Sequence, residues 1–171
     1  YTSSSADSNQ YSYMWKRAKG YFDVVAYTGT GSARTISHNL NVAPEMMWIK
    51  RRTTGSADWQ VYHSALGNAK ELHLNLTEAE ASSSKFNSTD PTSSVFSVGT
   101  ATSVNRSGDT YIAYLFATAA GVSKVGSYSG NSGTQTIDCG FSGGTGARFL
   151  LIKAYSTTGG WFVWDSARGI V

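Results

Sequence analysis

The sequence is poor in cysteine and proline, with a single cysteine, Cys139, and two prolines. A single cysteine excludes a disulfide bridge within the chain, so the protein does not belong to the small secreted domains that depend on such bridges. Assembly in a reducing cytosol is therefore expected. Cys139 lies in the segment TIDCGF, which suggests a buried, inward-facing strand position with a structural role.

Long hydrophobic runs are also missing. No apolar stretch approaches the roughly 20 residues needed to span a bilayer, and no signal peptide opens the chain. We therefore expect a soluble protein with no membrane insertion.

Charge is scarce as well, at 15% of the residues with a formal net charge of +3. The basic residues gather in two runs, Lys16-Arg17-Lys19 and Lys50-Arg51-Arg52. Such runs are typical of solvated strand ends that discourage edge pairing, and the alternative is a patch for anionic sugars or nucleic acid. We favour the first interpretation and expect no nucleic-acid partner.

Helical periodicity is almost absent, and its best candidate, residues 77–84, is too short and too rich in serine for more than a turn or two. Strand signals dominate instead, as short runs of β-branched and aromatic residues separated by Gly, Ser, Thr and Asn. These runs are YFDVVAYTG, MMWIKRR, WQVYHS, ELHLNL, SVFSVG, TYIAYLFAT, KVGSYSG, RFLLIKAY and WFVWDS. The pattern predicts an all-β fold, an antiparallel β-sandwich of about ten to twelve short strands.

The chain repeats itself. The matching segments are 59–67 (WQVYHSALG) with 161–169 (WFVWDSARG), 24–37 with 125–138, and 11–20 with 112–121. Small slips in the spacing fall in joints rich in Gly, Ser and Thr, as expected of matched strands joined by loops of variable length. The sequence therefore predicts an internal pseudo-repeat.

The phase of this repeat predicts the domain organisation. Residues 1–20 are the end of a preceding repeat unit, 21–121 form a full unit, and 122–171 start a second, related unit that packs on the first. We expect the two to share one sandwich, in which each unit covers an apolar face of the other. The chain is then a fragment of a longer repeat-built polypeptide, and the alternative is a processed, self-contained precursor.

Catalytic and metal-binding patterns are not found. His38, His63 and His73 lack metal-site spacing, and Asp165 takes the place of His63 in the second repeat. No serine sits in a nucleophile elbow, and the glycine-rich loops lack the helix that would hold a phosphate. We therefore expect no enzymatic activity, no cofactor and no metal.

Aromatic residues are in excess, with five Trp, ten Tyr and seven Phe. Exposed Trp and Tyr rings stack on sugar faces, and two tryptophans lie beside acidic residues near loops. The candidate glycan platform comprises Asp58, Trp59, His63, Trp161, Trp164 and Asp165. The alternative, favoured for any single tryptophan, is that these rings fill the sandwich core, and burial of Trp59 and Trp161 would then remove the basis of the platform.

The segments YFDVVAYTGTGSARTISHNLNVAPEMMWIKRR, WQVYHSALG, DPTSSVFSVGT, TYIAYLFATAAGVSKVGSYSGN, TIDCGF and WFVWDSARGI resemble an uncharacterised domain. This domain is found repeatedly in tail-fibre-like and other virion proteins of tailed bacteriophages, especially marine phages of cyanobacteria. The resemblance covers nearly the whole chain from about residue 11. It implies a virion component at the tail or another surface appendage, and it brings no catalytic residues with it.

We therefore expect a structural and adhesion module of a phage tail fibre or similar appendage, located on the virion surface and contacting host glycan. Its expected partners are other copies of itself, by analogy a trimer, and other virion proteins. Two alternatives stay open: a purely architectural self-assembling subunit, such as a capsid decoration or filament protein, and a secreted carbohydrate-binding module.

Overall fold

The computed structural model describes residues 12–53, 55–141 and 146–169. Within these ranges the regular structure is ten β-strands and one short helix, α1 (Thr102–Asn105), so the predicted all-β class is confirmed. The strands are β1 (Phe22–Thr28), β2 (Arg34–Ser37), β3 (Met46–Arg51), β4 (Gln60–His63), β5 (Lys70–His73), β6 (Ala81–Ser82), β7 (Val95–Val98), β8 (Thr110–Phe116), β9 (Phe149–Lys153) and β10 (Trp161–Asp165).

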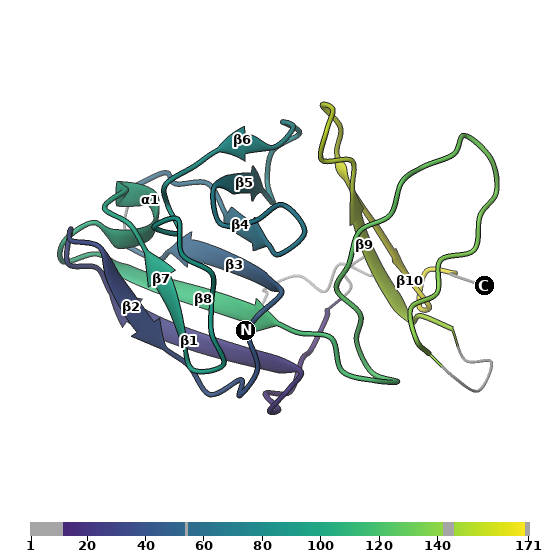
Figure 1. The fold of residues 1–171 in the computed structure, drawn as a ribbon, viewed down its shortest axis with the longest axis horizontal. Helices are drawn as coiled ribbons and strands as arrows, with labels where there is room; N and C mark the ends of the chain where they lie inside the picture. Colours follow the sequence, from purple (N-terminus) through teal and green to yellow (C-terminus); the bar gives the residue numbers. More distant parts are fainter. Residues whose placement is uncertain (1–11, 54, 142–145, 170–171) are drawn as a thin grey trace, which may run out of the picture.

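A six-stranded antiparallel sheet with the order β1-β8-β3-β4-β5-β6 forms the main layer (Figure 1). β8 lies between β1 and β3 and pairs with both along its length. Its sequence, TYIAYLF, is almost continuously apolar, as expected of a strand with neighbours on both edges and cover on both faces. A similar apolar run, RFLLI, also suggests a central strand, but its apolar residues lie in β9, which belongs to a two-stranded sheet with β10.

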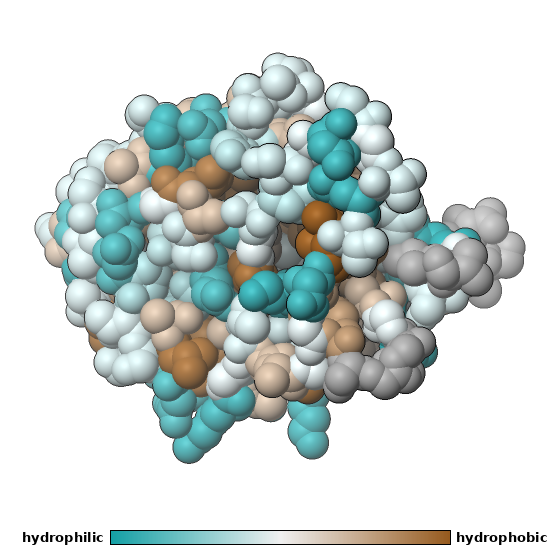
Figure 2. All heavy atoms as spheres, turned by 45° about the vertical axis from the view of Figure 1, so that its right-hand side comes forward, coloured by the Kyte–Doolittle hydropathy of each residue, from teal (hydrophilic) through white to brown (hydrophobic). Residues whose placement is uncertain are grey.

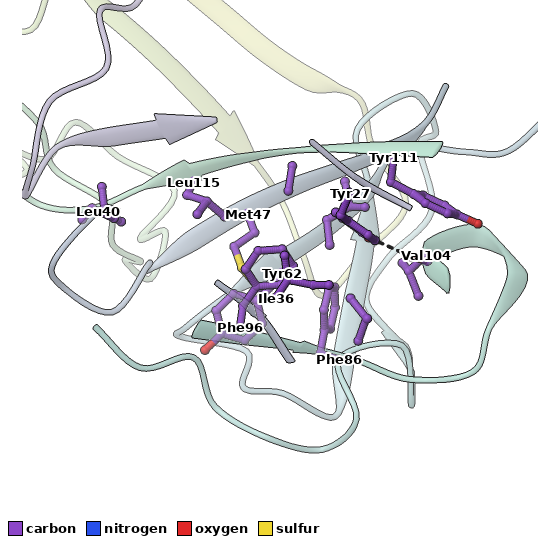
Figure 3. Close-up of a cluster of buried hydrophobic side chains, with 14 residues drawn as sticks. Tyr27, Ile36, Leu40, Met47, Tyr62, Phe86, Phe96, Val104, Tyr111 and Leu115 are labelled. Carbon is purple, nitrogen blue, oxygen red and sulfur yellow. Dashed lines mark hydrogen bonds between the residues drawn. The ribbon is translucent and has the colours of Figure 1, made fainter. Parts of the chain in front are cut away.

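A second layer covers one face of this sheet. It consists of the antiparallel pair β2-β7 and the helix α1, and it encloses a cluster of buried side chains (Figure 3). Tyr62, Phe86 and Phe96 contribute rings to this core, and the buried hydroxyl of Tyr27 donates a hydrogen bond of 2.7 Å to the carbonyl of Val104. The hydroxyl is thus satisfied where water cannot reach it.

The opposite face of the main sheet carries aromatic side chains from several strands. Phe22 of β1 contacts Tyr114 and Phe116 of β8, and Phe116 contacts Trp48 of β3 at a centroid distance of 4.5 Å. Trp15, from the segment that precedes β1, contacts Trp48 and Phe116 on this face. The sheet therefore presents apolar rings on both of its faces.

The hairpin β9-β10 forms a separate two-stranded sheet beside the main one (Figure 1). It is tied to the turn between β5 and β6 by backbone hydrogen bonds, since Gly159 donates to Thr77 at 2.7 Å and Glu80 donates to Tyr155 at 2.7 Å. Trp161 Nε1 also donates to the carbonyl of His73 at 2.8 Å. These hydrogen bonds tie the hairpin to β5 and to the turn that follows it.

Two sequence expectations differ from the structure. Residues 124–130 form no strand, although their counterparts lie in and just after β1. Cys139 is half-buried in a segment without strand structure, where we expected an inward strand position. The buried cluster lies between Tyr27 and Ala117, within the first predicted unit, and the sharing of one sandwich by the two units stays a prediction.

Candidate ligand-binding site

Trp59 and Asp58, at the start of the predicted platform, lie just before β4. The Trp59 ring is half-buried, with the Tyr114 ring centroid at 6.0 Å and Lys50 Nζ at 5.8 Å from its own centroid. Asp58 Oδ1 accepts a hydrogen bond of 2.8 Å from the side-chain amide of Asn75. Trp59 thus has partners in β3 and β8, and Asp58 has a partner in the turn after β5.

Trp161, Trp164 and Asp165, the second-repeat members of the platform, have three different environments. Trp161 is half-buried and hydrogen-bonded to β5, whereas the Trp164 ring is 44% exposed and stacks on Phe162 at 5.7 Å. Asp165 is buried and accepts hydrogen bonds from the Tyr13 hydroxyl at 2.7 Å and from Arg168 Nε at 2.6 Å. The hydrogen bond from Tyr13 holds the pKa of Asp165 below its usual range.

The structure brings some of these residues together and not others. Trp59 and Trp161 flank the end of β5, because Leu74 N donates to the Trp59 carbonyl at 3.2 Å while Trp161 binds the carbonyl of His73. His63 lies apart from both and lines a cavity that includes neither tryptophan. No single surface containing all six residues is therefore formed by these contacts, and the platform stays a prediction.

The cavity beside His63 has a volume of about 460 Å³. It lies between the outer face of the main sheet, the segment before β1, the loop at residues 121–126 and the start of β9. Figure 2 shows apolar groups exposed beside a hollow on the side of the molecule where the hairpin lies. Its aromatic lining residues are Trp15, Tyr21, Trp48, Phe116, Phe141 and Phe149.

Three of the rings around Trp15 stand nearly at right angles to it. The interplanar angle is 84° with Trp48, 83° with Phe116 and 84° with Phe149, at centroid distances of 5.8 to 6.4 Å. Edge-to-face contacts of this kind are favourable because the positive ring edge meets the negative ring face. The aromatic wall is therefore held in place by its own contacts.

The polar groups of the cavity are few. His63 Nδ1 accepts a hydrogen bond of 3.1 Å from Ala65 N, and burial lowers the pKa of this ring. Trp48 Nε1 is buried and has no hydrogen-bond partner among the described residues. Lys124 and Arg148 are exposed lining residues, and no carboxylate occurs among the lining residues that the structure describes. The cavity thus combines aromatic walls with positive charge.

Sequence analysis missed Trp15, Phe116 and Phe149 as site residues. The sequence repeat could have drawn attention to two of them, because an aromatic residue occupies the same position in both units. Trp15 is the counterpart of Phe116 in the alignment of residues 11–20 with 112–121. Their meeting, however, depends on tertiary packing that a pattern along the chain does not define. In the described ranges no three His, Cys, Asp or Glu side chains converge as metal ligands.

No helix in the described ranges has the length and apolar character of a membrane span. No curated protein matches this chain, and no solved structure matches it either. A family model does match, over residues 2–170. The chain belongs to that family, which is described as a domain of unknown function, DUF7483.

Proposed function

We propose that this chain is a non-enzymatic structural and adhesion module of a bacteriophage tail fibre or similar appendage, exposed on the virion surface. Its partners are other copies of itself, other virion proteins and host surface glycan. One observation supports the structural part of this proposal. A pair of strands occurs twice in the chain, once with one face buried beneath a second layer and once with the equivalent face partly exposed.

The hairpin β9-β10 reproduces the pairing of β3-β4. In β3-β4, Met46 pairs with His63 and Trp48 pairs with Val61. The repeat counterparts of these residues pair in the same way, as Phe149 with Asp165 and Leu151 with Val163. The sequence repeat is therefore also a repeat of strand register, which fixes the face on which each side chain lies.

The two hairpins differ in what covers them. Met47 and Tyr62 are buried beneath β2-β7, whereas their counterparts are the half-buried Leu150 and the exposed Trp164. Phe162, on the same face, is 53% exposed. Exposed apolar patches of this kind mark interaction sites, so an open copy of a core hairpin suits a protein built from repeated, mutually covering units.

Adhesion is tested by binding of the purified, fluorescently labelled protein to intact bacteria. Saturable binding to particular strains, displaced by unlabelled protein, is the expected result. The Trp59→Ala variant tests the predicted platform, because a glycan stacked on that ring loses about 1–3 kcal/mol when the ring is removed. A folded protein that binds no bacterium and stays monomeric would contradict both parts of the proposal.

The alternative function is that of a purely architectural, self-assembling subunit. The exposed apolar side chains of Phe162 and Trp164 favour it, because they could pack against another copy of the protein. If that face joins copies of the protein, a Phe162→Ser, Trp164→Ser double variant lowers the solution mass at a given concentration. Val42→Ser is the matched control, because Val42 is an exposed apolar residue of the first unit. Self-association without binding to cells would favour this alternative.

A further inference from the structure

We propose that the cavity between the main sheet and the start of β9 binds an acidic sugar residue, meaning a pyranose that carries a carboxylate. This inference rests on the proposed adhesion function and names the site and chemical class of the glycan. It concerns Trp15, Trp48, Lys124 and Arg148, none of which belongs to the platform predicted from the sequence.

The size and walls of the cavity suit a sugar ring. Its volume of about 460 Å³ falls within the range of small-molecule sites, about 300–1,000 Å³. Trp15 and Trp48 are both half-buried, so each ring is only partly covered by protein. The apolar C–H faces of a pyranose pack on such rings, and the hydroxyl groups remain free for hydrogen bonds.

The charge of the lining selects an anion. Lys124 and Arg148 lie at the cavity with exposed side chains, and the described residues offer neither of them a carboxylate within ion-pair distance. Among the described residues the lining contains no acidic side chain. A ligand carboxylate would meet two unpaired cations there, and a planar guanidinium binds a carboxylate through two parallel hydrogen bonds.

The positive charges of the lining argue against a cationic ligand, which is another common occupant of aromatic pockets. Rings set at right angles also bind quaternary ammonium groups, through the negative faces of the aromatic systems. Lys124 and Arg148 would repel such a cation at close range. A neutral apolar molecule would leave both cations without a partner, so the anionic sugar uses more of the lining than either alternative.

Trp48 adds a polar reason for a ligand with oxygen atoms. Its Nε1 is buried without an acceptor, and an unsatisfied buried donor costs free energy. Such a group in a folded protein calls for an explanation, such as an acceptor supplied by a bound molecule.

The test is a titration of the full protein with three probes, namely oligosaccharides of glucuronic, galacturonic and N-acetylneuraminic acid. Binding is followed by tryptophan fluorescence, since Trp15 and Trp48 line the cavity, and is measured independently by calorimetry. At least one acidic probe should bind, and neutral maltotriose should bind at least about tenfold more weakly, as expected for the loss of one charged hydrogen bond.

Charge-removing variants locate the binding. Lys124→Gln and Arg148→Gln should each weaken binding of the acidic probe about tenfold, whereas Arg52→Gln, an exposed cation outside the lining, should leave it unchanged. Trp48→Phe keeps an aromatic ring but removes the indole donor and should also weaken binding. Circular dichroism checks that each variant is folded.

Four results would overturn the inference. They are equal binding of neutral and acidic probes, no binding of any acidic probe, equal loss in Arg52→Gln and the two lining variants, or a changed solution mass in the lining variants, which would assign the cavity to a second copy. Saturable binding to bacteria that persists in Lys124→Gln and Arg148→Gln would reject the cavity while leaving the adhesion function standing.

Discussion

His38 and His63 are histidines whose pKa burial lowers, because the charged imidazolium loses its hydration inside the protein. His38 Nδ1 accepts a hydrogen bond of 3.2 Å from Leu40 N. An unfolded chain protonates these rings near pH 6.5, whereas the folded protein does so only at lower pH. Their contribution to the unfolding free energy is therefore intact above about pH 6.5 and decreases as the pH falls toward the folded pKa.

The first prediction follows from this sign. On acidification from about pH 7.5 to about pH 5.5, His38→Gln and His63→Gln should each lose less unfolding free energy than the unsubstituted protein. Urea unfolding at the two pH values measures this difference. An equal loss in all three proteins would show that neither ring carries the pH dependence.

Asp23 is a buried carboxylate with three hydrogen-bond donors around it. Arg17 Nε donates at 2.6 Å, and the backbone N–H groups of Val24 and Asn39 donate at 2.9 and 2.8 Å. The Arg17 side chain is 57% exposed, so water can take over part of its hydrogen bonding to Asp23 when the side chain is removed.

The second prediction compares the two partners of this ion pair. Asp23→Ala should cost about 3 kcal/mol, because it leaves buried donors without an acceptor. Arg17→Ala should cost less than about 1 kcal/mol, as is usual for the exposed partner of a surface pair. Chemical denaturation of both variants provides the test, and equal costs would contradict the assignment of the backbone donors as the main partners.

At the scale of elements, the repeat pair Gly29 and Gly130 shows how context decides the role of one residue type. A Cβ on Gly29 would lie 2.2 Å from the carbonyl oxygen of Arg106, closer than atoms can approach. Around Gly130, no atom of the described residues lies within 4 Å of the corresponding position, its two chain neighbours apart. The close approach exists only in the unit that has the segment after α1 packed against it.

The third prediction uses this matched pair. Gly29→Ala should destabilise the protein by about 3 kcal/mol, because it forces backbone to move. Gly130→Ala should change the stability by less than about 0.5 kcal/mol. Thermal unfolding of the two variants gives the comparison, and a similar loss in both would mean that the second unit also closes around its glycine.

Much of the element structure follows from the sequence. The echo of WQVYHSALG in WFVWDSARG predicts the equivalence of β4 and β10, and the apolar run of β8 predicts a central strand. Residues 124–130 share the pattern of β1 but form no strand. β1 is held along its length by β8, and a strand without such a neighbour lacks the pairing that stabilises it. Periodicity along the chain does not report whether that neighbour is present.

The candidate site was less predictable for the same reason. Asp58 and Trp59 are adjacent in the chain, and their position near a loop was correctly predicted. The cavity, in contrast, joins Trp15, Trp48 and Phe149 from distant parts of the sequence. Only the docking of β9-β10 beside the main sheet brings them together, and that docking depends on contacts such as the one between Trp161 and His73.

At the scale of the whole molecule, the two predicted units differ in how much apolar surface they bury. The buried cluster lies within the first unit, from Tyr27 to Ala117, whereas β9-β10 has half-buried and exposed residues on its apolar face. Segments with few buried apolar contacts open at lower free energy than core strands. The isolated protein should therefore be stable in its first unit and labile in its second.

The fourth prediction concerns this difference. The hairpin β9-β10 should unfold at a lower urea concentration than the main sheet. Trp164 fluorescence, isolated in a variant in which the other four tryptophans are replaced with phenylalanine, should report the earlier transition. A single transition shared by every probe would indicate one cooperative unit instead.

The central claim is that the hairpin β9-β10 repeats β3-β4 without the layer that covers it. Amide hydrogen exchange tests this claim most directly. β3 has strand neighbours on both edges, β4 and β8, whereas β9 pairs with β10 alone among the described residues. The amides of β3 should therefore exchange slowly and those of β9 orders of magnitude faster. Equal protection of β3 and β9 in the monomeric protein would contradict the claim, because it would mean that the second hairpin is already closed.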